Sequence, residues 1–328
     1  MTSDSAGANG PAAGFSHEPV MCAEIVDAFR PVAGGLIVDA TIGGGGHAEA
    51  LLRSRPDTTL LGIDRDPAAV AAATARLAHF GPRAEIRHGR FDRLGEILDD
   101  VCGRARPLRG ALFDFGVSSH QFDVAERGFS FRHEAPLDMR MDPGQDLRAD
   151  DIVNGCDAAE LARILRRNAD EPYARRIAAR IVERRPIKTT TELAGVVGSA
   201  VPAKARRGRR HPATRTFAAI RIEVNDELSL IEPALDAVLE RLAPLGRVAT
   251  LAYHSGEDRI VKIILRKAAD GLCECPSTLP CICGAEPTVR LISRSVVKPG
   301  AAEIRRNPRA SAARLRVAER LDVPAVSA

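Results

Sequence analysis

The chain has 328 residues, of which 45% are apolar, and a formal net charge of only +4, so it can bury a sizeable core and exceeds a typical single domain. It has no apolar run long enough to span a bilayer, no secretory pattern at its start and only seven cysteines, which excludes a membrane or disulfide-rich secreted protein and predicts a cytoplasmic one. Its 47 Lys and Arg residues nearly balance 43 Asp and Glu residues, yet the basic residues cluster locally, and arginine suits phosphate recognition.

Residues 1–15 are small, polar and rich in glycine, and they predict a disordered tail. A helical pattern follows over residues 20–29. The central feature is the segment 35–67, in which an apolar run ends at Asp39, four glycines lead into a helical pattern, and a second apolar run ends at Asp64. This order predicts a strand, a glycine turn, a helix and a second strand.

Such a unit usually binds a nucleotide-like cofactor where its strands end, because glycine lets the backbone approach a ligand closely. Gly43, Gly45 and Ala48 loosely satisfy the pattern of a dinucleotide-binding turn, but a carboxylate at Asp39 would repel a bound phosphate. S-adenosylmethionine has no phosphate, carries an ammonium and a sulfonium, and offers ribose hydroxyls to an acid such as Asp64. We therefore favour a methyl-donor site over an NAD site; a turn that only joins two elements is the third alternative.

Three further strand patterns each deliver candidate site residues. The third strand is followed by Phe91, which either lies on an adenine face or fills the core. The fourth ends with Asp114, which either has a chemical role or caps the next turn. The fifth is followed by His254, which either contacts the substrate or hydrogen-bonds its own loop. Because the carboxyl ends of parallel strands meet at one edge of a sheet, we expect these residues to lie beside Asp39 and Asp64.

Residues 123–212 interrupt the alternation of strands and helices with loop-like and then helical patterns. They predict an inserted helical substrate-binding domain within an α/β domain formed by residues 16–122 and 213–328. The insertion carries the dense basic run 204–211, which either neutralises nucleic-acid phosphates or is solvated surface. The candidate RNA-binding residues are Arg206, Arg207, Arg209, Arg210 and Arg215.

Four cysteines form two C-x-C pairs around a proline-containing turn, and four thiols so close together can hold tetrahedral zinc. The usual knuckle is C-x-x-C, however, so a zinc site stays an open alternative. The pairs are Cys273 with Cys275 and Cys281 with Cys283. The three remaining cysteines are expected to be small buried apolar residues: Cys22, Cys102 and Cys156. The segment 305–320 is basic again and is a second candidate to follow RNA.

Eleven short stretches together resemble one family, the bacterial 16S ribosomal RNA cytosine-N4 methyltransferases of the MraW/RsmH type. Each stretch is short and unspecific by itself, but they occur in order along nearly the whole chain. They are HEPV at 17, VDATIGGGGH at 38, IDRDP at 63, HGRF at 88, DFGVSS at 114, ERGFSF at 126, PLDMRMD at 136, YARRIAARIVERR at 173, HPATRTFAAIRIEVNDEL at 211, YHSGEDRIVK at 253 and NPRASAARLRVAER at 307.

The resemblance implies a Rossmann-like class I S-adenosylmethionine-dependent methyltransferase fold with an inserted all-helical domain. It implies methylation of the exocyclic N4 of a decoding-centre cytosine in 16S rRNA, with that RNA or the small ribosomal subunit as partner, and leaves open whether the chain forms a homodimer. The cofactor-binding residues that it implies are Gly45, Gly46, His47, Asp64, Phe91, Asp114 and Gln121. Two departures put details of base contact in doubt: the family usually reads F-H-S-L-E-D-R where this chain has YHSGEDR at 253, and T-F-Q-A where it has TFAA at 216.

The amino nitrogen of cytosine is a poor nucleophile because its lone pair is delocalised into the ring, so the protein must hold acceptors against its N–H groups. We expect Asp114 and nearby backbone carbonyls to do this, together with Ser118 or His254. Methylation at ring C5 would need a cysteine nucleophile, and none follows a strand beside the cofactor turn. The rival hypotheses are a non-catalytic RNA-binding assembly factor with a vestigial cofactor fold and an NAD-dependent oxidoreductase.

Overall fold

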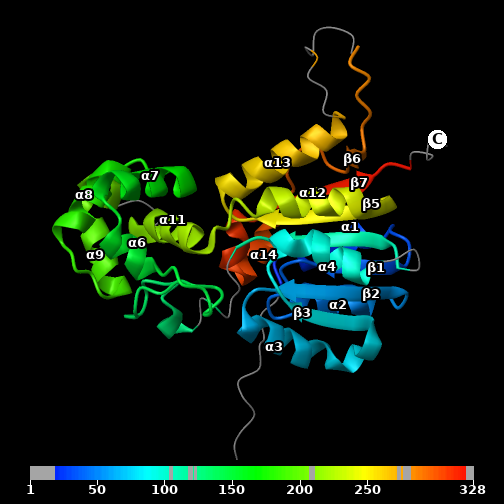
Figure 1. Cartoon of the computed structure of the whole chain (residues 1–328), viewed down its shortest axis with the longest axis horizontal. Helices are drawn as coiled ribbons and strands as arrows, with labels where there is room; N and C mark the ends of the chain where they lie inside the picture. The colour runs from blue at the N-terminus through cyan, green and yellow to red at the C-terminus, as the bar shows by residue number, and fades with distance from the viewer. Residues whose placement is uncertain are drawn as a thin grey trace, which may run out of the picture.

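The structure is a computed structural model that describes residues 19–102, 106–116, 121, 124–206, 211–271, 275 and 282–322. An α/β domain and a helical domain lie side by side (Figure 1). The expected disordered tail, residues 1–15, lies outside the described residues. Within the described part of the chain, no helix is both long enough and apolar enough to cross a membrane.

The α/β domain is built on a seven-stranded sheet in the order β3-β2-β1-β4-β5-β7-β6. The pairs among β1 to β5 are parallel, whereas β7 runs antiparallel to both β5 and β6. The order reverses between β1 and β4, and open sheets of this kind bind ligands outside the carboxyl ends of the strands at such a point. The strands are β1 (Gly35–Asp39), β2 (Thr58–Asp64), β3 (Ala84–His88), β4 (Leu108–Asp114), β5 (Leu242–Ala252), β6 (Val289–Leu291) and β7 (Arg314–Arg320).

Helices cover both faces of this sheet, because side chains alternate across each strand. Leu36 and Val38 of β1 belong to one core, with α4, α12 and α13, whereas Ile37 belongs to a second core on the other face, with α1, α2 and α3. Strands that are buried on both faces read as continuous apolar runs, which is why the sequence marks them so clearly. The helices are α1 (Cys22–Phe29), α2 (Gly46–Ser54), α3 (Pro67–Leu77), α4 (Leu94–Val101), α12 (Ile231–Arg241) and α13 (Ser255–Ala269).

The basic segment 305–320 is largely part of this domain. It contains the end of α14 (Ala301–Arg306) and the whole of β7. Arg316 on β7 forms an ion pair with Asp258, with 2.7 Å between Nε and Oδ1, and Arg320 donates to the Leu239 carbonyl oxygen at 3.1 Å. These two arginines therefore hold β7 against α13 and α12 instead of forming a free basic tail.

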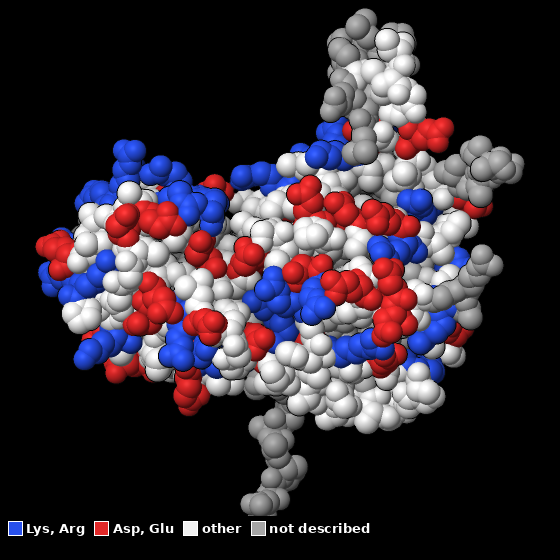
Figure 2. All heavy atoms as spheres, in the orientation of Figure 1, with Lys and Arg blue, Asp and Glu red and all other residues white. Residues whose placement is uncertain are grey.

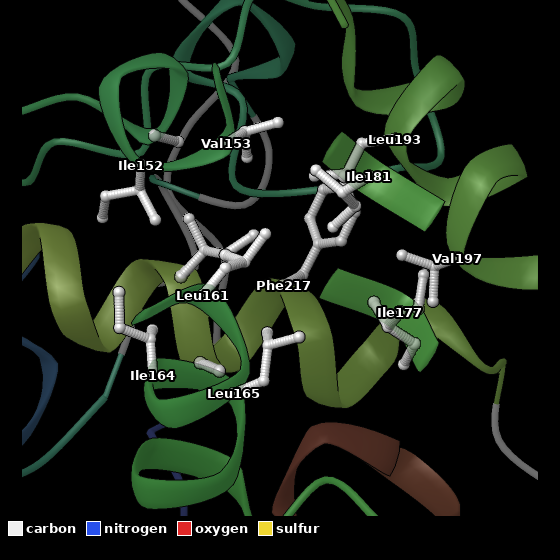
Figure 3. Packing of buried hydrophobic residues seen from close by; sticks show 14 of the residues in the cluster. Ile152, Val153, Leu161, Ile164, Leu165, Ile177, Ile181, Leu193, Val197 and Phe217 are labelled. Atoms are coloured by element: carbon white, nitrogen blue, oxygen red, sulfur yellow. The ribbon is translucent and has the colours of Figure 1, made fainter. Parts of the chain in front are cut away.

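The inserted helical domain has a core of its own (Figure 3). It contains α6 (Ala149–Gly155), α7 (Ala158–Ala169), α8 (Ala174–Glu183), α9 (Thr190–Ala200), α10 (Ala203–Arg206) and α11 (Ala213–Asn225). The sequence predicts that the insertion ends at residue 212, whereas Phe217, Ile220 and Val224 of α11 are buried in the helical core. The core of the insertion thus extends through α11, whose amphipathic pattern could have matched either domain.

Candidate active site

A cleft opens at the β1/β4 switch point, where the carboxyl ends of β1, β2, β4 and β5 meet. Most of its wall comes from residues at the ends of these strands or just after them, including Thr41, Asp64, Asp114 and Tyr253. The helical domain also contributes Met141 to the lining of the cleft. The sheet edge that the sequence predicted as the functional edge therefore lines a real cleft between the two domains.

The glycine turn forms one side of the cleft. Its backbone is folded back on β2, since the Gly43 N–H donates to Asp64 Oδ2 at 2.9 Å. Gly43 and Gly45 have φ angles of 50° and 77°, which favour glycine. A Cβ on Gly46 would lie 2.6 Å from Pro19 Cγ, so a side chain does not fit there. Gly43, Gly44 and Gly46 line the cleft, whereas the Cβ position of Gly45 faces Ala73 on α3.

Asp114 ends β4 and is held from several sides. Its Oδ1 accepts a hydrogen bond from the Tyr253 hydroxyl at 2.7 Å, its backbone N–H donates to Thr41 Oγ1 at 2.6 Å, and its Oδ2 lies 3.6 Å from His47 Nε2. Burial, followed by the charge of Asp114 and the hydrogen bond to it, raises the pKa of Tyr253 well above its ordinary value. The phenol therefore stays protonated and donates to Asp114. We did not single out Thr41 or Tyr253 from the sequence, although both directly follow predicted strands.

His47 brings a buried positive charge to this group. Burial alone would lower its pKa, but its contacts with Asp114 and Cys22 and the charges of Asp114 and Asp39 raise the pKa to about 10. At 3.6 Å its contact with Asp114 is an ion pair, longer than a hydrogen bond. Burial raises the pKa of the Asp39 carboxyl to about 7, although the charge of His47 opposes this change. The side chain of His47 is only 7% exposed, so its charge acts at short range with little screening.

An aromatic cluster forms another part of the wall. Phe91 lines the cleft and contacts Phe113 and Phe115 edge-on, with 6.3 Å and 6.0 Å between ring centroids. Phe91 is thus partly buried against the core, as one of our two readings expects, and its contact with an adenine stays a prediction. Beside it, burial raises the pKa of Asp64, against the hydrogen bonds that it accepts from the Asp66 and Gly43 N–H groups. Gln121 also lines the cleft, and its side chain donates to Asp66 at 2.8 Å.

The two domains are joined at the cleft by Arg65, a residue that we did not predict. Its guanidinium donates to the Asn225 carbonyl at 2.8 Å and to Gln145 Oε1 at 3.1 Å. Asn225 in turn accepts from the Met141 N–H and donates to the Met139 carbonyl, both at 2.8 Å. These partners are far apart in sequence, so no local pattern identifies them.

His254 has a structural position. Its Nδ1 accepts from the Gly256 N–H at 3.1 Å at the start of α13, and its Nε2 lies 2.9 Å from Glu257 Oε1. It is not among the residues that line the cleft, whereas the buried Glu257 is. The loop-bonding alternative for His254 is therefore the one that the geometry favours. The other candidate for this role, Ser118, lies outside the described residues.

The predicted RNA and zinc residues are only partly described. Arg215 is exposed on α11, but Arg207, Arg209, Arg210 and the side chain of Arg206 lie outside the described residues. Cys273 and Cys281 also lie outside them; Cys275 is half-buried and Cys283 exposed. Among the residues that can be described, no group of three or more His, Cys, Asp or Glu side chains is placed to hold a metal ion. Zinc binding thus stays a prediction. Cys22, Cys102 and Cys156 are half-buried free thiols rather than fully buried ones.

The chain is similar to known proteins over nearly its whole length. A family model described as the MraW methylase family matches residues 14–321. A relative from Dehalococcoides mccartyi, called ribosomal RNA small subunit methyltransferase H, is 49% identical over 314 residues, which cover 94% of this chain and 88% of the relative. A relative of the same name from Geotalea uraniireducens is 49% identical over 312 residues, which cover 94% of this chain and 99% of the relative.

Proposed function

Because the chain belongs to the MraW methylase family, we propose that it methylates the exocyclic N4 amine of a decoding-centre cytosine in 16S rRNA. The names of its relatives support an RNA of the small ribosomal subunit as substrate. The cofactor is S-adenosylmethionine, which supplies an electrophilic methyl group on a sulfonium. The observation that carries the proposal is the carboxylate of Asp114, which lies in the cleft at the end of β4 between a hydroxyl donor and a buried cation.

The residues of the cleft fit a phosphate-free cofactor with positive charge. The N–H groups of Gly43 and Gly45 already donate to Asp64 and to the Ile42 carbonyl, at 2.9 Å and 2.8 Å, so these amides of the turn are not free for a pyrophosphate. Both ring nitrogens of His47 are buried without a hydrogen-bond partner among the described residues, and buried polar groups usually have one. A ligand with a carboxylate at one end would satisfy the charged imidazole.

Within the cleft we assign the ribose hydroxyls to Asp64 and the adenine face to Phe91. The methionine end is assigned to the turn, with Gly46 and His47 in contact and Gly45 shaping the backbone. Gln121 is assigned to the edge of the cofactor site, where its bond to Asp66 holds the segment after β4 against the segment after β2. These assignments use residues that the resemblance implied, and all of them except Gly45 line the cleft.

Asp114 supplies the acceptor that the cytosine amine needs. Its carboxylate takes a hydrogen bond from the amine, which frees the nitrogen lone pair from the ring as the nitrogen becomes pyramidal. Tyr253 and Thr41 fix the orientation of Asp114 before the substrate arrives, and such preorganised electrostatics usually supply a large part of the rate enhancement. The base reaches the cleft by leaving its stacked RNA context.

An Asp114→Asn variant tests the proposal, because it keeps the shape of the side chain and removes the charge. We expect methyl transfer from labelled donor to small subunits from cells lacking the chain to fall by about a hundredfold or more, a much larger loss than any loss in the affinity for S-adenosylhomocysteine. Mass mapping of the modified nucleotide should show N4-methylcytidine with the wild-type protein.

Four results would contradict the proposal. Wild-type transfer by Asp114→Asn would remove the role of Asp114, and a methyl group on a ring carbon would remove the amine as target. A wild-type protein that binds the RNA but transfers no methyl group would favour the assembly factor, and binding of a nicotinamide dinucleotide without S-adenosylhomocysteine would favour the oxidoreductase.

A further inference from the structure

A second hollow lies on the outer face of the helical domain, apart from the cleft. It has a volume of about 560 Å³, within the range of ligand-binding pockets. Figure 2 shows Lys and Arg side chains gathered over α7 and α8, where this hollow lies. Its floor is made of small side chains and its rim of arginines, and we call it the α7 groove. The floor is Ala158, Ala159 and Ala162, and the rim is Arg163, Arg166, Arg167 and Arg175.

The arginines of the α7 groove are not needed for packing. α7 buries Leu161, Ile164 and Leu165 against the helical core and turns its arginines to solvent. α8 likewise buries Ile177 and leaves Arg175 exposed. The core therefore accounts for the apolar face of each helix, and the cationic face is left without a structural role.

The positive charge of the groove is only partly balanced. Arg163 pairs with Glu160, and Arg167 pairs with Glu223 at 2.5 Å. No ion pair links Arg166 or Arg175 to any other described residue. Exposed ion pairs contribute little to stability, so a phosphate can displace the carboxylate from Arg163 or Arg167 at small cost. Arginine matches phosphate with two parallel hydrogen bonds.

Polar contacts link the helix that carries the α7 groove to the helix that starts beside the active cleft. Asp170, at the carboxyl end of α7, accepts from the Ser255 hydroxyl at 3.1 Å and pairs with Arg259 at 3.4 Å. Ser255 begins α13, two residues after Tyr253 in the cleft. The twelve residues of α7 span about 18 Å, so the arginines of the groove that lie on α7 are within that distance of Asp170.

We propose that the α7 groove binds the phosphate backbone of the RNA that flanks the target base, and so holds the substrate while the base enters the cleft. The identity of the partner as RNA rests on the proposed function. The small alanine floor leaves room for the sugars between the arginines, and phosphate contacts fix position without reading sequence. None of the residues that line the α7 groove belongs to the basic run at 204–211.

The test compares an Arg166→Gln/Arg175→Gln variant with wild type in binding a transcript of the 16S decoding region and an unrelated RNA of equal length. The logarithm of the binding constant falls as the logarithm of the salt concentration rises, and each lost phosphate contact makes this negative slope shallower by about 0.7 for a single strand. We expect the slope of the variant to be shallower by about 1.4. Its affinity at low salt should be about tenfold weaker, equally for both RNAs. Binding of S-adenosylhomocysteine should not change.

Two further variants separate this effect from folding and from net charge. Arg93→Gln/Arg184→Gln removes two exposed charges outside the groove and should keep the wild-type slope within about 0.5. Arg166→Lys/Arg175→Lys keeps the charges and should keep most of the slope. A Gln variant that loses RNA and S-adenosylhomocysteine together is misfolded, and the single variants Arg166→Gln and Arg175→Gln then decide. A salt slope that is shallower by about 0.7 in each supports the groove, and a wild-type slope in both overturns it.

The proposal is overturned if the Gln variant binds both RNAs with wild-type affinity and slope, if the control loses as much, or if the Lys variant loses as much as the Gln variant. It is also overturned if the Gln variant loses binding only to phosphatidylserine vesicles, because the groove would then serve a membrane surface. If the wild-type protein transfers no methyl group but the salt slope of RNA binding still changes in the Gln variant, the proposed function is wrong and the groove is still an RNA-binding site.

Discussion

The buried charge of His47 gives a prediction that can be worked through in detail. A His47→Gln variant keeps a polar side chain and removes the cation that faces Asp39 and Asp114. Removing one partner of a buried ion pair costs about 3–5 kcal/mol. The side chain of Asp114 is 26% exposed and the ion pair spans 3.6 Å, so solvent screens part of this energy. We expect the free energy of unfolding to fall by about 2–3 kcal/mol near pH 6.

The sign of the pH dependence follows from the pKa of His47, which burial would lower but which Asp114, Cys22 and Asp39 raise from 6.5 to about 10. A group whose pKa is raised on folding contributes stability that is fully present below its unfolded pKa and lost as the pH rises through its folded pKa. The difference in unfolding free energy between wild type and His47→Gln should therefore be largest near pH 6 and shrink steadily toward pH 10.

The assay is urea denaturation followed by circular dichroism, at pH 6, 8 and 9.5 and without cofactor, so that stability is measured apart from ligand binding. His79→Gln is the matched control, because His79 is exposed on the surface and its replacement should change the unfolding free energy by no more than about 0.5 kcal/mol. An equal loss for His47→Gln at pH 6 and pH 9.5 would refute the reasoning, since the effect would then come from packing and not from charge.

Two further predictions concern the cleft and the domain junction. Phe91→Leu keeps most of the contact with Phe113 and Phe115 but removes the aromatic face, so the free energy of unfolding should change by less than about 1.5 kcal/mol. Calorimetry should show that S-adenosylhomocysteine binds about tenfold more weakly. Unchanged affinity would make Phe91 a core residue only. Asn225→Ala leaves the buried Met141 N–H and Met139 carbonyl without their partner, which should cost about 2–4 kcal/mol in urea denaturation; a loss below about 0.5 kcal/mol would show that water replaces the amide.

The helical domain shows where local patterns stop being informative. The amphipathic helices of the insertion were predictable, because apolar residues recur on one face of each. The domain against which α11 packs was not predictable, since its apolar face fits either domain. Only the packing of the folded chain places Phe217 and Val224 in the helical core. The helical pattern likewise predicts that the arginines of α7 and α8 are exposed, but whether they line one groove depends on how the two helices pack.

By itself the sequence determined the parallel strands, the glycine turn and the acids at the strand ends, because buried strands and tight turns need particular residue types over a few neighbouring positions. The contacts among those strand-end residues became visible only in the folded chain. The Tyr253 hydroxyl reaches Asp114 across 139 residues, and Arg65 reaches Asn225 across 160. The tertiary structure also separated His254, which bonds its own helix start, from His47, which lies charged between two carboxylates. Such roles depend on burial and on distant partners, and neither leaves a periodic signal in the chain.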